Sequence, residues 1–235
     1  MEGQPDAAPA IRPLDAIERR VLGTLIEKGK TTPDQYPLSL NALVTGCNQK
    51  SNREPVMTLD EEQVARALAG LRSCGAAAEV FGSGKIPRYR HLAYEWLGVD
   101  KEQLAILGEL LLRGAQTEGD LRGRASRMDP IPDLDALRGH LDALAAKGLV
   151  VWLTPPGRGR LLTHGLLPPE KLAAVRAQLP TPAPDEPGAS APAPAPAPAP
   201  AERPVGDVER RLEALEAAFA EAVARIAALE DAQAG

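Results

Sequence analysis

Hydrophobic residues recur at helical spacing near the start of the chain. Between residues 14 and 29, Leu14, Val21 and Leu25 lie on one helical stripe, and charged residues occupy the other side. This spacing predicts an amphipathic helix that ends at a glycine, residue 29. A shorter helix is expected just after it, because Ser39 can cap a helix that begins at the next residue.

A third helix is predicted over residues 58–75. Its start is the sequence Thr58-Leu59-Asp60-Glu61, in which the Thr58 hydroxyl and the Glu61 carboxylate can form a capping box. Two short strand-like runs follow, at residues 78–81 and 86–92, around a glycine-rich turn. Three helices followed by a β-hairpin predict a winged helix.

The same pattern then occurs a second time. A shift of 85 positions aligns Leu22-Gly23 with Leu107-Gly108, and a shift of 73 aligns Leu71 and Gly75 with Leu144 and Gly148. A second hairpin is expected over residues 149–153 and 161–164. This internal repeat predicts two tandem winged-helix domains, at residues 14–98 and 99–172. The fold class is therefore mostly α, with small β-hairpin wings.

The remaining segments have a different composition. Residues 1–13 are small and proline-containing, and we expect them to be disordered. Residues 173–206 are rich in alternating Ala and Pro, which predicts a stiff linker that buries no core. Residues 207–235 carry apolar residues at alternating four- and three-residue spacing, which predicts a coiled-coil helix. Residues 207–231 would then pair two chains as a homodimer, unless this helix docks on the body instead.

The segment between the second and third predicted helices is polar. It reads Asn48-Gln49-Lys50-Ser51-Asn52-Arg53-Glu54-Pro55-Val56, and we call it the signature loop. The run from Cys47 to Arg53, followed by Pro55-Val56, resembles the signature of the YceH family of uncharacterised bacterial proteins. The resemblance covers roughly residues 14–172. It implies tandem winged helices and brings no activity with it.

Charge is unevenly distributed along the chain. The net charge of −5 at first argues against nucleic-acid binding. Of the 32 acidic and 27 basic residues, however, ten acids and four bases lie in residues 181–235, which leaves 22 acids and 23 bases in residues 1–180. A nearly neutral body permits DNA binding without indicating it.

The residues that carry chemistry form no catalytic pattern. The two cysteines have neither disulfide nor metal-ligand spacing, and His91, His140 and His164 are far apart in the sequence. We therefore expect a non-enzymatic protein without a metal or cofactor. The chain also begins without a signal peptide and has no run of 18 apolar residues, so we expect a cytoplasmic protein that does not contact membranes.

Nucleic-acid binding is the sharper functional hypothesis, because the third helix of a winged helix usually enters the major groove while the wing contacts phosphate. The candidate binding residues are polar or basic residues of the signature loop, of both wings and of the segment after the fifth helix. They are Asn48, Gln49, Lys50, Ser51, Asn52 and Arg53; Lys85, Arg88 and Arg90; Arg122 and Arg124, with Arg127 nearby; and Arg158 and Arg160.

Acidic residues oppose this hypothesis. The third helix begins Asp60-Glu61-Glu62 and its counterpart begins Asp133-Leu134-Asp135, so both helices present carboxylates where phosphate would lie. Two functions stay open. One is DNA binding, with a role related to transcription, through the wings and the signature loop. The other is a protein-interaction platform like the bacterial chromosome-segregation proteins of the ScpB type, without direct DNA readout.

The signature loop has two corresponding interpretations. In the first, a donor-rich edge of the loop binds phosphate or the carboxylates of a partner, and it consists of Gln49, Lys50, Asn52 and Arg53. Alternatively the loop is architectural: Asn48, Ser51 and Asn52 cap the preceding helix, and Arg53 pairs with Glu54 or with an acid on a helix.

Overall fold

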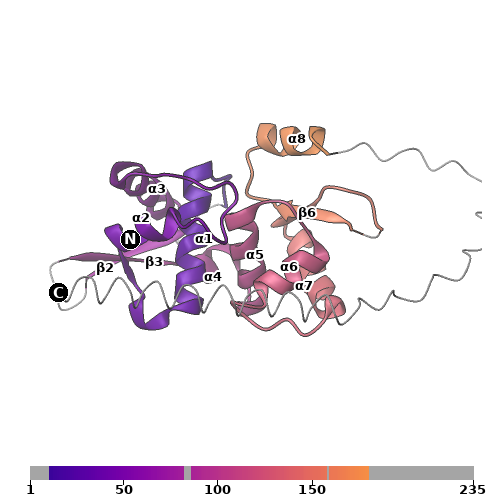
Figure 1. Cartoon of the computed structure of the whole chain (residues 1–235), viewed down its shortest axis with the longest axis horizontal. Helices are drawn as coiled ribbons and strands as arrows, with labels where there is room; N and C mark the ends of the chain where they lie inside the picture. Colours follow the sequence, from indigo (N-terminus) through magenta and orange to yellow (C-terminus); the bar gives the residue numbers. More distant parts are fainter. Residues whose placement is uncertain (1–10, 82–85, 158, 180–235) are drawn as a thin grey trace, which may run out of the picture. The chain divides into compact units, whose positions relative to one another are not determined.

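The first repeat places three helices against a small sheet. The computed structural model describes residues 11–81, 86–157 and 159–179. The elements in order are α1 (Ala16–Thr31), the short 3₁₀-helix η1 (Pro33–Gln35), β1 (Leu38–Ser39), α2 (Leu40–Cys47), α3 (Glu61–Ser73), β2 (Ala77–Phe81) and β3 (Pro87–His91). Figure 1 shows the β2–β3 hairpin extending away from the helices.

The second repeat has the same order of helices and strands. The short helix α4 (Ala93–Leu97) leads into it. It then contains α5 (Lys101–Arg113), β4 (Gln116–Thr117), α6 (Glu118–Ala125), α7 (Leu134–Ala146), β5 (Val150–Trp152) and β6 (Leu161–His164), followed by α8 (Pro169–Ala177). The prediction of a mostly helical body with two hairpins is confirmed.

Each hairpin gains a third strand that the sequence analysis missed. The sheet orders are β1-β3-β2 and β4-β6-β5, and every pairing is antiparallel. In the first sheet Leu38 pairs with Tyr89, and in the second Gln116 pairs with Leu162. Strands β1 and β4 contain two residues each, which is too short for an alternating pattern to be recognised.

Two predicted helix ends were wrong. Helix α3 is capped by Asp60, which accepts a 2.7 Å hydrogen bond from the Gln63 amide, while Gln63 Oε1 accepts a 3.0 Å bond from the Asp60 amide. The capping box therefore lies two residues beyond the predicted Thr58 pair. Helix α1 continues past the predicted end at residue 29 to Thr31, whose hydroxyl bonds the Glu27 carbonyl. The predicted Ser39 cap of α2 is confirmed.

The described residues cover only part of the C-terminal region for which the sequence makes predictions. Helix α8 starts with a proline in its first turn, and it crosses the boundary predicted at residue 173. The rest of the Ala/Pro linker and the coiled-coil helix at 207–235 lie outside the described residues, so both stay predictions. In the described part of the chain, no helix is long and apolar enough to cross a membrane.

The core is centred on the contact between α1 and α5, which joins the two repeats (Figure 1). Every residue from Val21 to Glu27 and from Gln103 to Leu112 is buried, so over these stretches both helices are covered on all sides. Glycines allow the close approach. A Cβ atom added to Gly108 would lie 2.8 Å from Ile26 Cγ2, and one added to Gly23 would lie 3.0 Å from Leu112.

Replacing Gly108 by Ala should therefore destabilise the protein. Although Ala favours helix, its methyl group would push α1 and α5 apart in a closely packed core, at a cost of about 1–3 kcal/mol. Gly139 of α7 is the matched control, because a Cβ atom there meets nothing within 4 Å. Gly139→Ala should stabilise by up to about 1 kcal/mol. Thermal unfolding measures both changes, and a stabilised Gly108→Ala variant would contradict the packing described.

The two hairpins end in histidines with equivalent contacts. His91 Nδ1 accepts a hydrogen bond from the Ala93 amide, and His164 Nδ1 accepts one from the Leu166 amide. Burial is the main cause that lowers the pKa of His91 to about 4 and that of His164 to about 3. Nearby Lys30 and Arg19, respectively, lower these pKa values further. Both rings are therefore neutral in the folded protein at neutral pH.

These histidines should make the protein less stable in acid. Below a pH of about 6.5 the unfolded chain binds protons that the folded chain rejects, so the free energy of unfolding falls as pH drops toward 4. Each histidine contributes a slope of up to about 1.4 kcal/mol per pH unit in that window. Chemical denaturation at several pH values should show a shallower slope for His164→Asn, which retains an acceptor, than for the parent protein. Equal slopes in the two proteins would refute this account.

Candidate nucleic-acid interface

The signature loop is fixed at both ends by hydrogen bonds. The Asn48 side chain bonds both backbone groups of Leu59. Its Nδ2 donates to the Leu59 carbonyl at 2.8 Å, and its Oδ1 accepts from the Leu59 amide at 2.7 Å. From α1, Arg20 donates to the Cys47 carbonyl at 3.1 Å and to the Pro55 carbonyl at 2.6 Å. One guanidinium group thus bonds both the residue just before the loop and a residue near the end of the loop.

Arg53, a candidate binding residue, points inward. Its side chain is fully buried, and Nη2 lies 2.6 Å from Glu27 Oε2 on α1. It also donates to the Gly46 carbonyl and to Gln49 Oε1. Of the two interpretations of this residue, pairing with a helix acid is therefore the one observed. Its donors bind the protein's own groups rather than a phosphate at the surface.

Two other loop residues connect the first repeat to α5. Asn52 has a φ of 58°, a conformation that Asn tolerates better than most residues. Its Oδ1 accepts a 2.7 Å hydrogen bond from Arg113, and the Glu54 amide donates to the Leu112 carbonyl at 2.9 Å. The loop thus bridges α1 and α5, which sequence spacing did not reveal because α5 lies some fifty residues further along the chain.

A buried carboxylate extends this bridge into the second repeat. Glu109 of α5 is fully buried, and its oxygens lie 3.0 Å from Arg113 Nε and 3.2 Å from Arg127 Nη2. Burial raises the pKa of Glu109, while the two arginines oppose that rise. Arg113 is aligned poorly for a hydrogen bond to Glu109, so this contact is an ion pair only. Arg127 is consequently an internal partner of α5.

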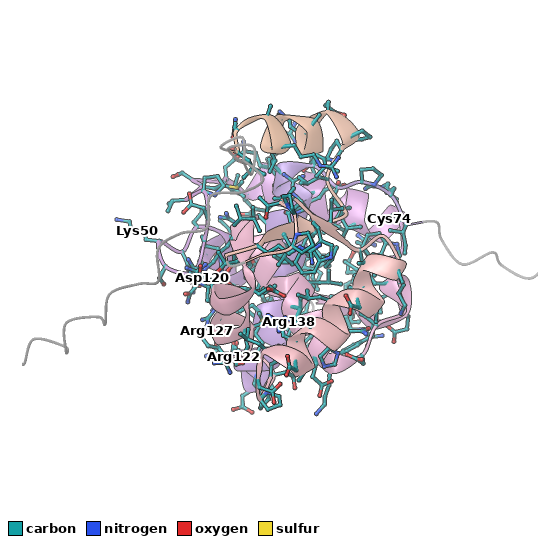
Figure 2. All side chains as sticks on the ribbon, turned by 90° about the vertical axis from the view of Figure 1, so that its right-hand side faces the viewer. Lys50, Cys74, Asp120, Arg122, Arg127 and Arg138 are labelled. Carbon is teal, nitrogen blue, oxygen red and sulfur yellow. The ribbon has the colours of Figure 1, made fainter. Side chains whose placement is uncertain are left out.

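Part of the signature loop lies at the surface. Lys50, Ser51, Glu54, Pro55 and Val56 are exposed, and Figure 2 shows the Lys50 side chain pointing away from the body. Gln49 is half-buried and accepts the bond from Arg53. Lys50 is therefore the one cation of this loop that can meet an external anion.

The first hairpin exposes two arginines. Arg88 and Arg90 alternate with Tyr89 along β3, so both lie on the same face of the sheet and opposite Val80 and Ala78 of β2. Arg88 gives one donor to the Pro37 carbonyl, at 2.9 Å. The Arg90 side chain is exposed and, in the described part of the chain, forms no hydrogen bond or ion pair. Lys85, the third candidate on this hairpin, lies outside the described residues.

The arginines of the second repeat are used internally. Arg122 and Arg124 lie within α6 rather than after a helix. Thr117 caps the start of α6, so the segment that contains both arginines is itself helical. Arg122 donates to the Ile131 and Pro132 carbonyls, and Arg124 donates to Gln116. Arg160 stacks on Trp152, with its guanidinium carbon 3.4 Å from the ring centre. Arg158 lies outside the described residues.

The acids at the starts of α3 and α7 lie at the surface, as the sequence predicted. Glu61, Glu62 and Asp133 are exposed. Asp135 is also exposed and pairs with Arg138 at 3.1 Å. These carboxylates would repel phosphate at the helix ends expected to face DNA.

Other candidate chemistry is limited. Cys47 and Cys74 are free and buried, as expected of small core residues. Among the described residues, no group of three or more His, Cys, Asp or Glu side chains is placed to hold a metal ion.

Comparison with known proteins identifies relatives over most of this body. The family model described as "Protein of unknown function, DUF480" matches residues 14–158. A UPF0502 protein of Rhodopirellula baltica is 59% identical over 160 residues, which are 68% of each chain. A UPF0502 protein of Geobacter sulfurreducens is 53% identical over 143 residues, 61% of this chain and 63% of that one. One from Cupriavidus taiwanensis is 43% identical over 159 residues, 68% of this chain and 63% of that one.

The stretch matched by the family model includes the signature loop and both helices that join the repeats. The family model and the relatives confirm the resemblance to the YceH-like proteins. The chain belongs to the DUF480, or UPF0502, family of uncharacterised bacterial proteins.

Proposed function

We propose that the protein is a non-enzymatic tandem winged-helix protein that binds the phosphate backbone of DNA through its first hairpin. The winged-helix assignment is supported by the order helix, strand, helix, helix and hairpin, which occurs in both repeats. It is also supported by the sheet order, in which the strand that precedes the second helix pairs with the last strand of the hairpin.

The observation that carries the proposal is the exposed pair Arg88 and Arg90 on β3. All side-chain donors of Arg90 and most side-chain donors of Arg88 are unused by the described residues. A guanidinium group presents five N–H donors in a planar arrangement that fits phosphate oxygens. Two such groups on one strand face can contact neighbouring phosphates, and Lys50 supplies a further exposed cation.

The acids at the start of α3 indicate which kind of binding to expect. Glu61 and Glu62 disfavour insertion of this helix end into a groove, where it would read base edges. Phosphate contacts position a protein on DNA without reading its sequence. The proposed binding is therefore salt-dependent and tolerant of sequence. Pairing of two chains through residues 207–231 would bring two hairpins to one duplex and strengthen binding.

A second function is favoured by the surface of the second repeat. Leu134 is 38% exposed at the start of α7, and the exposed carboxylates of Asp133 and Asp135 flank it. The nearby arginines bind internal groups. This apolar residue between acids suits a basic protein partner better than DNA, so the second repeat would serve as a protein-interaction surface.

The proposed DNA contact can be tested by replacing both hairpin arginines. In the full chain, Arg88→Ala/Arg90→Ala should weaken binding to a fluorescent duplex at least about tenfold at moderate salt, because two phosphate contacts are lost. The salt dependence measured by anisotropy should flatten by about 1.8 in log–log slope. Arg176→Ala, which removes an exposed arginine of α8, is the control and should bind normally. Undiminished binding by the double variant would refute the proposal.

The roles of Lys50 and Arg53, the two cations of the signature loop, can be tested by replacing each of them in turn. Arg53→Ala leaves Glu27 as a buried, unpaired carboxylate and should lower the free energy of unfolding by about 3–5 kcal/mol. Lys50→Ala should change stability by no more than about 0.5 kcal/mol, since Lys50 is exposed. Lys50→Ala should also weaken DNA binding and reduce the salt slope by about 0.9. An Arg53→Ala variant as stable as the parent would show that the buried pair is not what holds the loop.

A further inference from the structure

A cleft of about 550 Å³ lies on the side of α1 that faces α8. Its walls come from the first turns of α1, the end of the signature loop, the end of α5, strand β6 and α8. Small-ligand sites in proteins commonly have volumes of about 300–1,000 Å³. Apolar side chains form much of the lining, and they include Met57, Leu110, Leu111, Leu167 and Val175.

Arg20 lines this cleft as a buried cation. Only 1% of its surface is exposed. Its two terminal nitrogens bond backbone carbonyls, and Nε has no hydrogen-bond partner among the residues that the structure describes. Within the described residues, no carboxylate lies in salt-bridge range of this guanidinium. Burial, followed by the charge of Arg53, holds the pKa of Arg20 below its ordinary value. A buried charge without a counterion is strongly unfavourable, so this position favours an external anion.

Two further donors line the same cleft. Arg19 is half-buried and gives one donor to the Leu14 carbonyl at 2.5 Å. Among the described residues Arg19 forms no ion pair, and burial lowers its pKa, although the charges of Asp15 and Glu18 act in the opposite direction. Because Nδ1 of the neutral His164 ring accepts the Leu166 amide, the ring proton resides on Nε2, which is left as a donor.

The charges around the cleft are mostly positive. Lys171 of α8 and Arg113 join the two arginines of α1 in the lining, although Arg113 is already paired with Glu109. Of the carboxylates in the described part of the chain, Glu54 alone lines the cleft, and it is exposed to solvent, which screens its charge.

We propose that this cleft binds a small organic anion that has one carboxylate or phosphate group on an apolar body. The charged group lies beside Arg19 and Arg20, and the apolar body packs against Met57 and the leucines of α5. Apolar contacts with a few well-placed polar groups are the usual composition of a small-ligand site. This site is separate from the exposed hairpin arginines and is independent of DNA binding.

Calorimetry on the full chain tests the ligand class. Hexanoate and phenyl phosphate represent the two anionic head groups, and hexanamide matches hexanoate without its charge. We expect at least one anion to bind and to raise the melting temperature, with hexanoate binding at least about tenfold more tightly than hexanamide if the carboxylate is the preferred group. Absence of binding by both anions would overturn the proposal, as would hexanamide binding as tightly as the tighter anion.

Variants locate the site. Arg19→Gln should weaken binding of the tighter anion at least about tenfold, because a charge-assisted hydrogen bond is lost. Ala16→Trp places a large ring in the cleft from an exposed position and should abolish binding without unfolding the protein. Lys28→Gln removes a charge from α1 outside the cleft lining and is the matched control. Arg88→Ala/Arg90→Ala should also bind normally, which separates this site from the DNA contact. Unchanged binding by Arg19→Gln or Ala16→Trp would refute the site.

Discussion

The fold depends on how closely α1 and α5 can approach each other. Each helix has a stretch that is covered on all sides by other parts of the body, and each presents a glycine where the other presents a large aliphatic side chain. Dense packing of this kind cannot absorb even one extra methyl group without displacement. The two repeats therefore share one hydrophobic cluster, although their sequences resemble two independent copies of one unit.

Polar contacts reinforce the same junction. The signature loop bonds α1 through Arg53 and Glu27, and it bonds α5 through Asn52 and the Glu54 amide. Such buried ion pairs contribute little net stability when formed, but losing one partner is costly. These contacts favour one conformation of the loop where it lies against α1 and α5. This explains why the loop is so polar in composition and yet exposes only one of its two cations, Lys50.

Sequence reasoning was most successful where a pattern is local. The apolar stripes of α1, α3, α5 and α7, the hairpins and the Ser39 cap all follow from spacing between near neighbours. It failed where a residue's partner is remote. The inward direction of Arg53 depends on Glu27, and the use of Arg122 and Arg160 depends on carbonyls and a Trp ring that only the fold brings close. The cleft beside Arg20 could not be predicted, because its walls come from five separate segments. A run of arginines in a sequence therefore says little about how many are exposed.

The burial of the middle of α1 on every side also has a consequence for protein synthesis. One face of α1 is covered by elements of the first repeat, but the other is covered by α5, which ends at Arg113, roughly eighty residues after α1 ends. Ribosomes add about 5–20 residues per second. The apolar face of α1 is thus without its partner for about 4–16 seconds while the chain grows. During that interval the nascent first repeat carries an uncovered hydrophobic helix, the kind of surface that chaperones bind.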